Sequence, residues 1–172
     1  MTLPFLFYLV GMIGNIGVVP TLLSTFDILA MFASLLLLLY CVIYLWRKKK
    51  GGQLVTTGPY RIVRHPQYLS ITIFTLITTY QSIWVLMNTF GLGWLSIEGT
   101  WMLWIGMLIA YIVIASFEEL HLQNVFGSSW DEYRKRVGFL LPFVKFKSRI
   151  LEAIVCLIIP IIILYTMLFF LA

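Results

Sequence analysis

Long apolar runs alternate with short polar segments along this chain. Five runs, at about 3–22, 28–46, 68–87, 100–117 and 150–172, approach the roughly 20 residues that a helix needs to cross a bilayer. They are continuous and do not alternate in polarity as barrel strands do, and lipid offers the backbone no hydrogen-bond partners. The pattern therefore predicts an all-α membrane protein with about five transmembrane helices.

Composition agrees with a membrane protein. Of the 172 residues, 61% are hydrophobic and only 11% are charged, whereas a soluble domain carries about 25% charged residues. We expect one membrane domain over 1–172, surrounded by lipid, with no nucleic-acid partner. Cys41 and Cys156 lie inside apolar runs without a spaced partner, so we predict neither a disulfide nor a metal site. The first run lacks a basic start and a cleavage site, so it is interpreted as a retained helix.

The cations predict the orientation in the membrane. All 12 Lys and Arg fall in two segments, 47–64 and 134–149. Under the positive-inside rule, the N-terminus and both basic loops lie in the cytoplasm and the C-terminus lies on the opposite side. A site built from the two loops would then open to the cytoplasm.

The second basic loop carries its own helix signals. We expect the fourth helix to continue to Phe126 and to end at Gly127. A short helix over 130–137 would follow, with Ser129 and Glu132 as a capping box and Gly138 as its stop. The apolar stretch FLLPFVKF, which Pro142 interrupts, is expected to lie along the membrane surface.

The segment GPYRIVRHPQY, at 58–68, is stiffer than an anchor requires. A residue before proline is held out of helix, which restrains Gly58 and His65, and Pro66 suits a first helical turn. The loop would end at a helix N-terminus, where free N–H groups favour an anion. We interpret it as half of a binding site. The run RKKK at 47–50 is interpreted as a topology anchor outside that site.

The other half is expected in FEELHL. Glu118 and Glu119 could be a solvated exit from the bilayer, but negative charge suits a helix C-terminus poorly unless the helix continues or a cation compensates. The facing loop supplies cations on the same side of the membrane. Together the two segments could hold a zwitterionic ligand. His121 shares the face of Glu118, and a hydrogen bond between the two is its simpler interpretation.

Three motifs carry a family resemblance. LVTTGPYRIVRHPQY, then EEL, then FGSSWDEYRKRVGFLLPF resemble the integral-membrane methyltransferases, which include isoprenylcysteine carboxyl methyltransferases and phospholipid N-methyltransferases. The resemblance covers about 53–146 and leaves 150–172 as an extra C-terminal helix. It implies that S-adenosylmethionine binds between the loop and the paired glutamates, with S-adenosylhomocysteine as product. The implied cofactor-binding residues are Gln53, Leu54, Val55, Tyr60, His65, Pro66, Gln67, Tyr68 and either Glu118 or Glu119.

Residue chemistry, added to this resemblance, predicts roles in catalysis. Arg64 and Glu119 are the expected catalytic residues, and Arg61 and Arg134 the expected substrate-binding residues. The acceptor would be lipophilic, with an isoprenylcysteine-type carboxylate favoured over a phospholipid amine. An amine would have to lose a proton, which Glu119 or His121 could take. Two departures stand out: Ser70 replaces a frequent glycine, and no basic residue precedes the paired acids on the fourth helix.

Other classes fit less well. A steroid-reductase-like oxidoreductase would bind a nicotinamide cofactor, whose phosphates call for more cations than acids. A transporter would want an ionisable residue near mid-membrane, and the five runs have none at their centres. A structural membrane subunit is the other non-enzymatic alternative. A soluble-type methyltransferase would need a Gly-rich strand–turn–helix pattern, which the sequence lacks.

Overall fold

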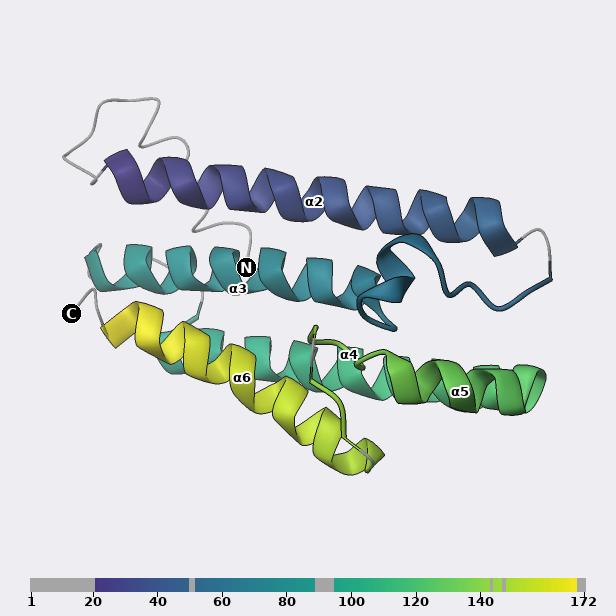
Figure 1. Ribbon diagram of the computed structural model, residues 1–172. Coiled ribbons are helices and arrows are strands. Elements are labelled where there is room, and N and C mark those ends of the chain that lie inside the picture. The colour runs from purple at the N-terminus through teal and green to yellow at the C-terminus, as the bar shows by residue number, and fades with distance from the viewer. Residues whose placement is uncertain (1–20, 50–51, 89–94, 143, 147, 170–172) are drawn as a thin grey trace.

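The computed structural model describes residues 21–49, 52–88, 95–142, 144–146 and 148–169. In chain order the elements are α2 (Thr21–Lys49), the 3₁₀ turn η1 (Gly58–Arg61), α3 (Pro66–Asn88), α4 (Ile97–Phe126), α5 (Ser128–Arg136) and α6 (Arg149–Phe169). The long helices run side by side, with α2 and α6 on opposite sides of α3 and α4 (Figure 1). The predicted first helix, over 3–22, falls almost wholly outside the described residues.

Four of these helices are long and apolar enough to cross a membrane: Phe26–Lys48, Pro66–Met87, Ile97–Phe126 and Arg149–Phe169. They coincide with the second to fifth predicted runs, which confirms an all-α, multi-pass membrane protein. Most of α3 is buried, and it contacts α2, α4 and α6. The other three helices expose most of their apolar side chains, as lipid-facing helices do.

α3 is the centre of the bundle although it is rich in Ser and Thr. Hydroxyl groups of Ser70, Thr75 and Thr78 donate to backbone carbonyls three or four residues earlier, which satisfies them inside the protein. An apolar cluster of Tyr80, Trp104, Leu108 and Leu164 then joins α3, α4 and α6. This core fixes the positions of α4 and α6 relative to α3.

The helix ends match the sequence only in part. α4 continues to Phe126 and Gly127 follows with a φ of 52°, as predicted. The predicted capping box is wrong, because α5 begins at Ser128, so Ser129 lies inside the helix. The carbonyl of Gly127 accepts hydrogen bonds from the N–H groups of Trp130 and Asp131, so the next helix starts at once. Glu132 pairs instead with Arg136, at 3.1 Å on the surface.

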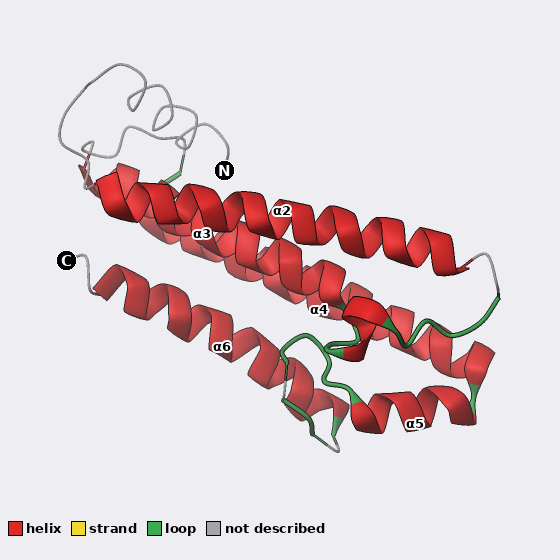
Figure 2. Cartoon of the chain, turned by 45° about the horizontal axis from the view of Figure 1, so that its top comes forward, coloured by secondary structure: helices red, strands yellow, loops and turns green. Residues whose placement is uncertain are grey.

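The stretch FLLPFVKF after α5, predicted to lie along the membrane surface, begins inside the protein and ends with Lys145 and Phe146 exposed. Phe139 and Leu140 are buried against Ala115 and Cys156. Backbone hydrogen bonds hold it there: the N–H of Arg64 donates to Gly138 O at 2.9 Å, and that of His65 to Phe139 O at 3.2 Å. The two basic loops therefore meet at one end of the bundle (Figure 2). We call this end, with Lys48, η1, α5 and the start of α6, the basic end.

Candidate functional site

The loop before α3 is held between α2 and α5. Gly58 has a φ of 63°, and an added Cβ would lie 2.7 Å from Cζ of Tyr44 in α2, so glycine suits this close approach. On the other side, the hydroxyl of Tyr133 in α5 donates to the carbonyl of Tyr60 at 2.6 Å. The hydroxyl of Tyr60 donates to Gln67 Oε1 at 3.2 Å, and burial raises its pKa, so this phenol stays protonated at neutral pH.

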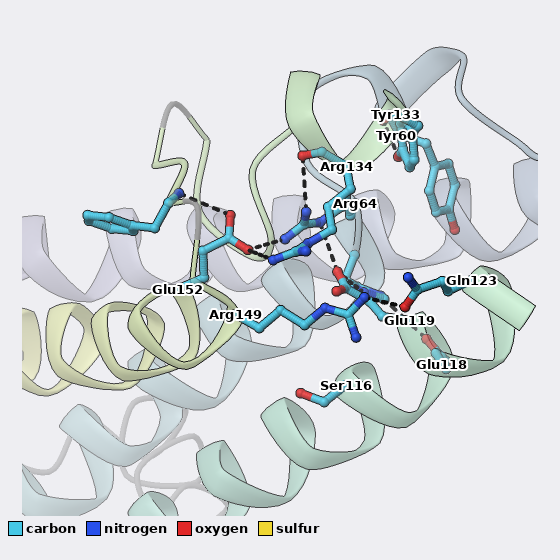
Figure 3. A network of polar contacts seen from close by, with 12 residues as sticks. Tyr60, Arg64, Ser116, Glu118, Glu119, Gln123, Tyr133, Arg134, Arg149 and Glu152 are labelled. Atoms are coloured by element: carbon cyan, nitrogen blue, oxygen red, sulfur yellow. Dashed lines mark hydrogen bonds and ion pairs between the residues drawn. The ribbon is translucent and has the colours of Figure 1, made fainter. Parts of the chain in front are cut away.

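Arg64 lies at the centre of a buried charged cluster. Its Nε is 2.8 Å from Glu119 Oε1 on α4, and its Nη2 is 2.5 Å from Glu152 Oε2 on α6. Nη1 donates to the carbonyl of Arg134 on α5 at 3.2 Å, and the guanidinium lies 5.6 Å from the ring centroid of Phe139. One side chain thus joins the loop to three helices (Figure 3).

His65 lies between the paired glutamates. Its imidazole is buried, with Nδ1 3.4 Å from Glu118 Oε2 and Nε2 3.5 Å from Glu119 Oε1. Burial lowers the pKa of His65, but hydrogen bonds to the two carboxylates and their charges outweigh it and raise the pKa above 6.5. The rings of Phe139 and His65 meet edge to face, with their centroids 5.2 Å apart. The structure therefore brings the two predicted halves of the site together.

The two glutamates differ in access. The side chain of Glu119 is 4% exposed and faces Arg64 and His65. The side chain of Glu118 is 45% exposed and accepts a hydrogen bond from Tyr68 at 3.2 Å. A ligand arriving from solvent can therefore reach Glu118, whereas Glu119 stands behind it.

The remaining predicted residues differ in their surroundings. Leu54 is half-buried against Trp130 and Tyr133, Val55 is half-buried, and Pro66 begins α3 as expected. Gln53 and Arg61 are exposed, outside the network of contacts just described. Arg134 is half-buried, and its Nη2 lies 3.9 Å from Glu152.

Sequence reasoning missed three residues of this cluster: Phe139, Arg149 and Glu152. The sequence placed Glu152 only at the end of an apolar run. It is in fact 3% exposed, and its Oε1 accepts a hydrogen bond from the N–H of Phe146 at 3.4 Å. Arg149 donates to Gln123 Oε1 on α4. The one available signal was a pair of opposite charges three residues apart, on the same side of the bundle as the paired glutamates.

A cavity of about 290 Å³ adjoins the cluster between α4 and α6. Three charged side chains line it, Glu119 from α4 and Arg149 and Glu152 from α6, together with Ser116 and apolar side chains. Figure 3 shows Arg149 reaching from α6 toward Gln123 on α4, with Ser116 on the neighbouring turns of α4.

The fold and this site define a multi-pass helical membrane protein with a buried Arg–Glu–His cluster where two loops meet. Residues 40–116 match the model of the isoprenylcysteine carboxyl methyltransferase family. This match confirms the resemblance predicted from the motifs and supports a membrane methyltransferase. It covers the end of α2, the loop, α3 and most of α4, and it stops two residues before Glu118. Comparisons with curated proteins and with solved structures gave no match.

Proposed function

We propose that this protein is an S-adenosylmethionine-dependent methyltransferase that methylates a lipophilic acceptor, with an isoprenylcysteine-type carboxylate favoured over a phospholipid amine. The observation that carries the proposal is the position of His65, with its two ring nitrogens 3.4 and 3.5 Å from oxygens of Glu118 and Glu119. The loop and the paired glutamates are the segments between which the resemblance expects the cofactor, and here they are in contact.

The side chains present fit that cofactor. S-adenosylmethionine carries a carboxylate, an ammonium, a sulfonium and an adenosine. Glu118 is exposed enough to accept from the ammonium or from ribose hydroxyls. The half-buried ring of Tyr68 is proposed to pack on the adenine or near the sulfonium. Tyr60 is 4% exposed and its ring stacks on Tyr44, with centroids 6.4 Å apart, so it would form the inner wall of the site. The remaining residues proposed to hold the cofactor are Gln53, Leu54, Val55, His65, Pro66 and Gln67.

When bound, the cofactor would supply an activated methyl group on sulfur, which would pass to the acceptor with S-adenosylhomocysteine as the leaving product. The chain's task is to align the two partners. Arg64 fixes Glu119 and Glu119 fixes His65, so both predicted catalytic residues would act at least as positioning residues. A carboxylate acceptor is already ionised at neutral pH and needs no general base, unlike an amine.

The site is proposed to open to the cytoplasm. The described cations gather at the basic end, where Lys48 and Arg61 are exposed. With single cysteines placed at Lys48 and at Ser96, a membrane-impermeant reagent should label only the Ser96→Cys variant in intact cells. Labelling of Lys48→Cys from outside would reverse the orientation.

The function is tested by isothermal titration of S-adenosylhomocysteine into the full chain in lipid nanodiscs. We expect saturable binding that the double variant Glu118→Ala and His65→Ala abolishes. Lys48→Ala, at the exposed end of α2, should bind as the unchanged protein does. No binding, or binding that the double variant retains, would overturn the cofactor site.

The acceptor class is tested separately. Transfer of a radiolabelled methyl group should be measured to N-acetyl-S-farnesylcysteine and to phosphatidylethanolamine. Label in the first as a base-labile ester is the expected result. Label in the second alone would replace the carboxylate by an amine acceptor.

A further inference from the structure

The cavity between α4 and α6 has one charged wall and one apolar wall. Toward the inside of the bundle it meets the charged cluster, through Glu119 and Glu152. Toward the outside it is lined by Leu120 and Ile150, whose side chains are 47% and 71% exposed. Both lie on helices that are long and apolar enough to cross a membrane, so this side of the cavity is an exposed apolar surface of the kind that lipid chains cover. The cavity therefore opens from a charged interior onto an exposed apolar surface.

The arginines around the cavity differ in their partners. Glu119 and Glu152 both pair with Arg64, at 2.8 and 2.5 Å. Arg134 is 3.9 Å from Glu152, and Arg149, which lines the cavity, bonds to the neutral amide of Gln123. Three guanidinium groups thus face the two carboxylates that line the cavity. Asp131 accepts from Nε2 of the same Gln123 amide at 3.4 Å, so the contact that Arg149 itself makes is to a neutral group. An anion placed beside Arg149 would be favoured, because buried charge is stable only when it is compensated.

Glu119 links this cavity to the cofactor site. It lines the cavity, and its Oε1 also faces Arg64 Nε and His65 Nε2. His65 in turn contacts Glu118, the more exposed glutamate. A ligand head in the cavity would therefore lie one side chain away from the residues proposed to hold the cofactor.

We propose that this cavity binds the anionic head of an amphiphile, with Arg149 as the cation that pairs with it. The apolar chain leaves between Leu120 and Ile150 into the bilayer. The head is a carboxylate or a phosphate ester, the two anions that a guanidinium binds through paired hydrogen bonds. Resting on the proposed function, the carboxylate is that of the methyl acceptor, and α6, outside the family match, supplies its recognition.

Binding is measured on the full chain in phosphatidylcholine nanodiscs, without any turnover. The probes are N-acetyl-S-farnesylcysteine, its neutral methyl ester, and phosphatidic acid. We expect the farnesylcysteine carboxylate to bind and its methyl ester to bind at least about tenfold more weakly, as loss of a charge-assisted contact predicts. Tight binding of phosphatidic acid alone would assign the site to anionic lipid and not to the acceptor.

Two variants test the location. Arg149→Gln should weaken binding of the carboxylate about tenfold and leave the methyl ester unaffected. Ala153→Leu fills the cavity without changing charge and should weaken both ligands, since Ala153 lines it. Lys145→Gln removes an exposed cation just before α6 and should change neither. A thermal unfolding curve for each variant establishes that it is folded.

The outcomes separate this inference from the proposed function. If S-adenosylhomocysteine binds but neither Arg149→Gln nor Ala153→Leu affects carboxylate binding, the cavity assignment is wrong and the methyltransferase proposal stands. If the carboxylate binds through Arg149 but S-adenosylhomocysteine does not bind, the methyltransferase proposal is wrong and the anion site stands.

Discussion

The guanidinium of Arg64 lies between Glu119 of α4 and Glu152 of α6, with its nitrogens 2.8 and 2.5 Å from their carboxylate oxygens. Glu152 is 88 residues away in the chain. All three side chains are almost completely buried. Charges removed from water in this way are stable only together. The C-terminal helix is therefore part of the site and not an appendage to it.

Removing the carboxylate of Glu152, which pairs with buried Arg64, should lower the unfolding free energy far more than removing a surface carboxylate does. Glu152→Gln leaves Arg64 with one carboxylate in a buried position, and we expect a loss of roughly 3–5 kcal/mol of unfolding free energy. The measurement is urea unfolding in detergent, followed by circular dichroism. The matched control is Glu132→Gln, because Glu132 and Arg136 form an exposed pair at 3.1 Å. It should cost less than about 1 kcal/mol, and equal losses in the two variants would contradict the buried cluster.

The His65 contacts predict how stability changes with pH. Burial lowers the pKa of His65, but Glu118 and Glu119 raise it above the ordinary value of 6.5. The protonated form thus favours folding, so its stabilisation is complete below about pH 6.5 and is lost as the pH rises through the raised pKa. The midpoint temperature of the unchanged protein, minus that of His65→Gln, should fall as the pH rises above about 6.5. A difference that grows with pH would refute the arrangement; His121→Gln, at an exposed histidine, controls for loss of an imidazole.

Gly138 has no room for a side chain. An added Cβ would lie 2.6 Å from the carbonyl oxygens of Leu141 and Val144, and backbone cannot move aside as a side chain can. Gly138 also accepts the backbone hydrogen bond from Arg64. Gly138→Ala should therefore cost about 1–3 kcal/mol and weaken S-adenosylhomocysteine binding. Gly106→Ala, where a Cβ meets nothing within 4 Å, is the control in thermal unfolding and should not destabilise the protein.

The hydrogen bond from Tyr133 to the carbonyl of Tyr60 fixes the loop from the side of α5. Tyr133→Phe removes only the hydroxyl and leaves a buried carbonyl unpaired, which should cost about 1–3 kcal/mol. Titration of S-adenosylhomocysteine should also give weaker binding, because Tyr60 belongs to the proposed site. Tyr165→Phe, at an exposed tyrosine of α6, should change neither quantity. If Tyr133→Phe, like Tyr165→Phe, changes neither stability nor S-adenosylhomocysteine binding, the loop does not depend on this hydrogen bond.

Features that depend only on residues close together in the sequence could be predicted. The apolar runs correspond to α2, α3, α4 and α6, since length and hydropathy suffice to identify a helix that can cross a membrane. Gly127 ends α4 and Pro66 begins α3, because glycine and proline act through their own backbone. The capping box predicted at Ser129 and Glu132 was wrong, because Gly127 ends α4 and is also the N-cap of α5, which begins at Ser128.

The sequence alone determined that this is a helical membrane protein, that its cations gather in two loops, and that His65 belongs with the paired glutamates. Only the tertiary structure decided that Glu119 is buried while Glu118 is accessible, that Phe139 packs under His65, and that Arg149 and Glu152 of α6 join the site. An apolar run fixes a helix but not its rotation or its neighbours. Whether a charge at the end of a run meets lipid head groups or a buried arginine depends on how α4 and α6 pack against α3.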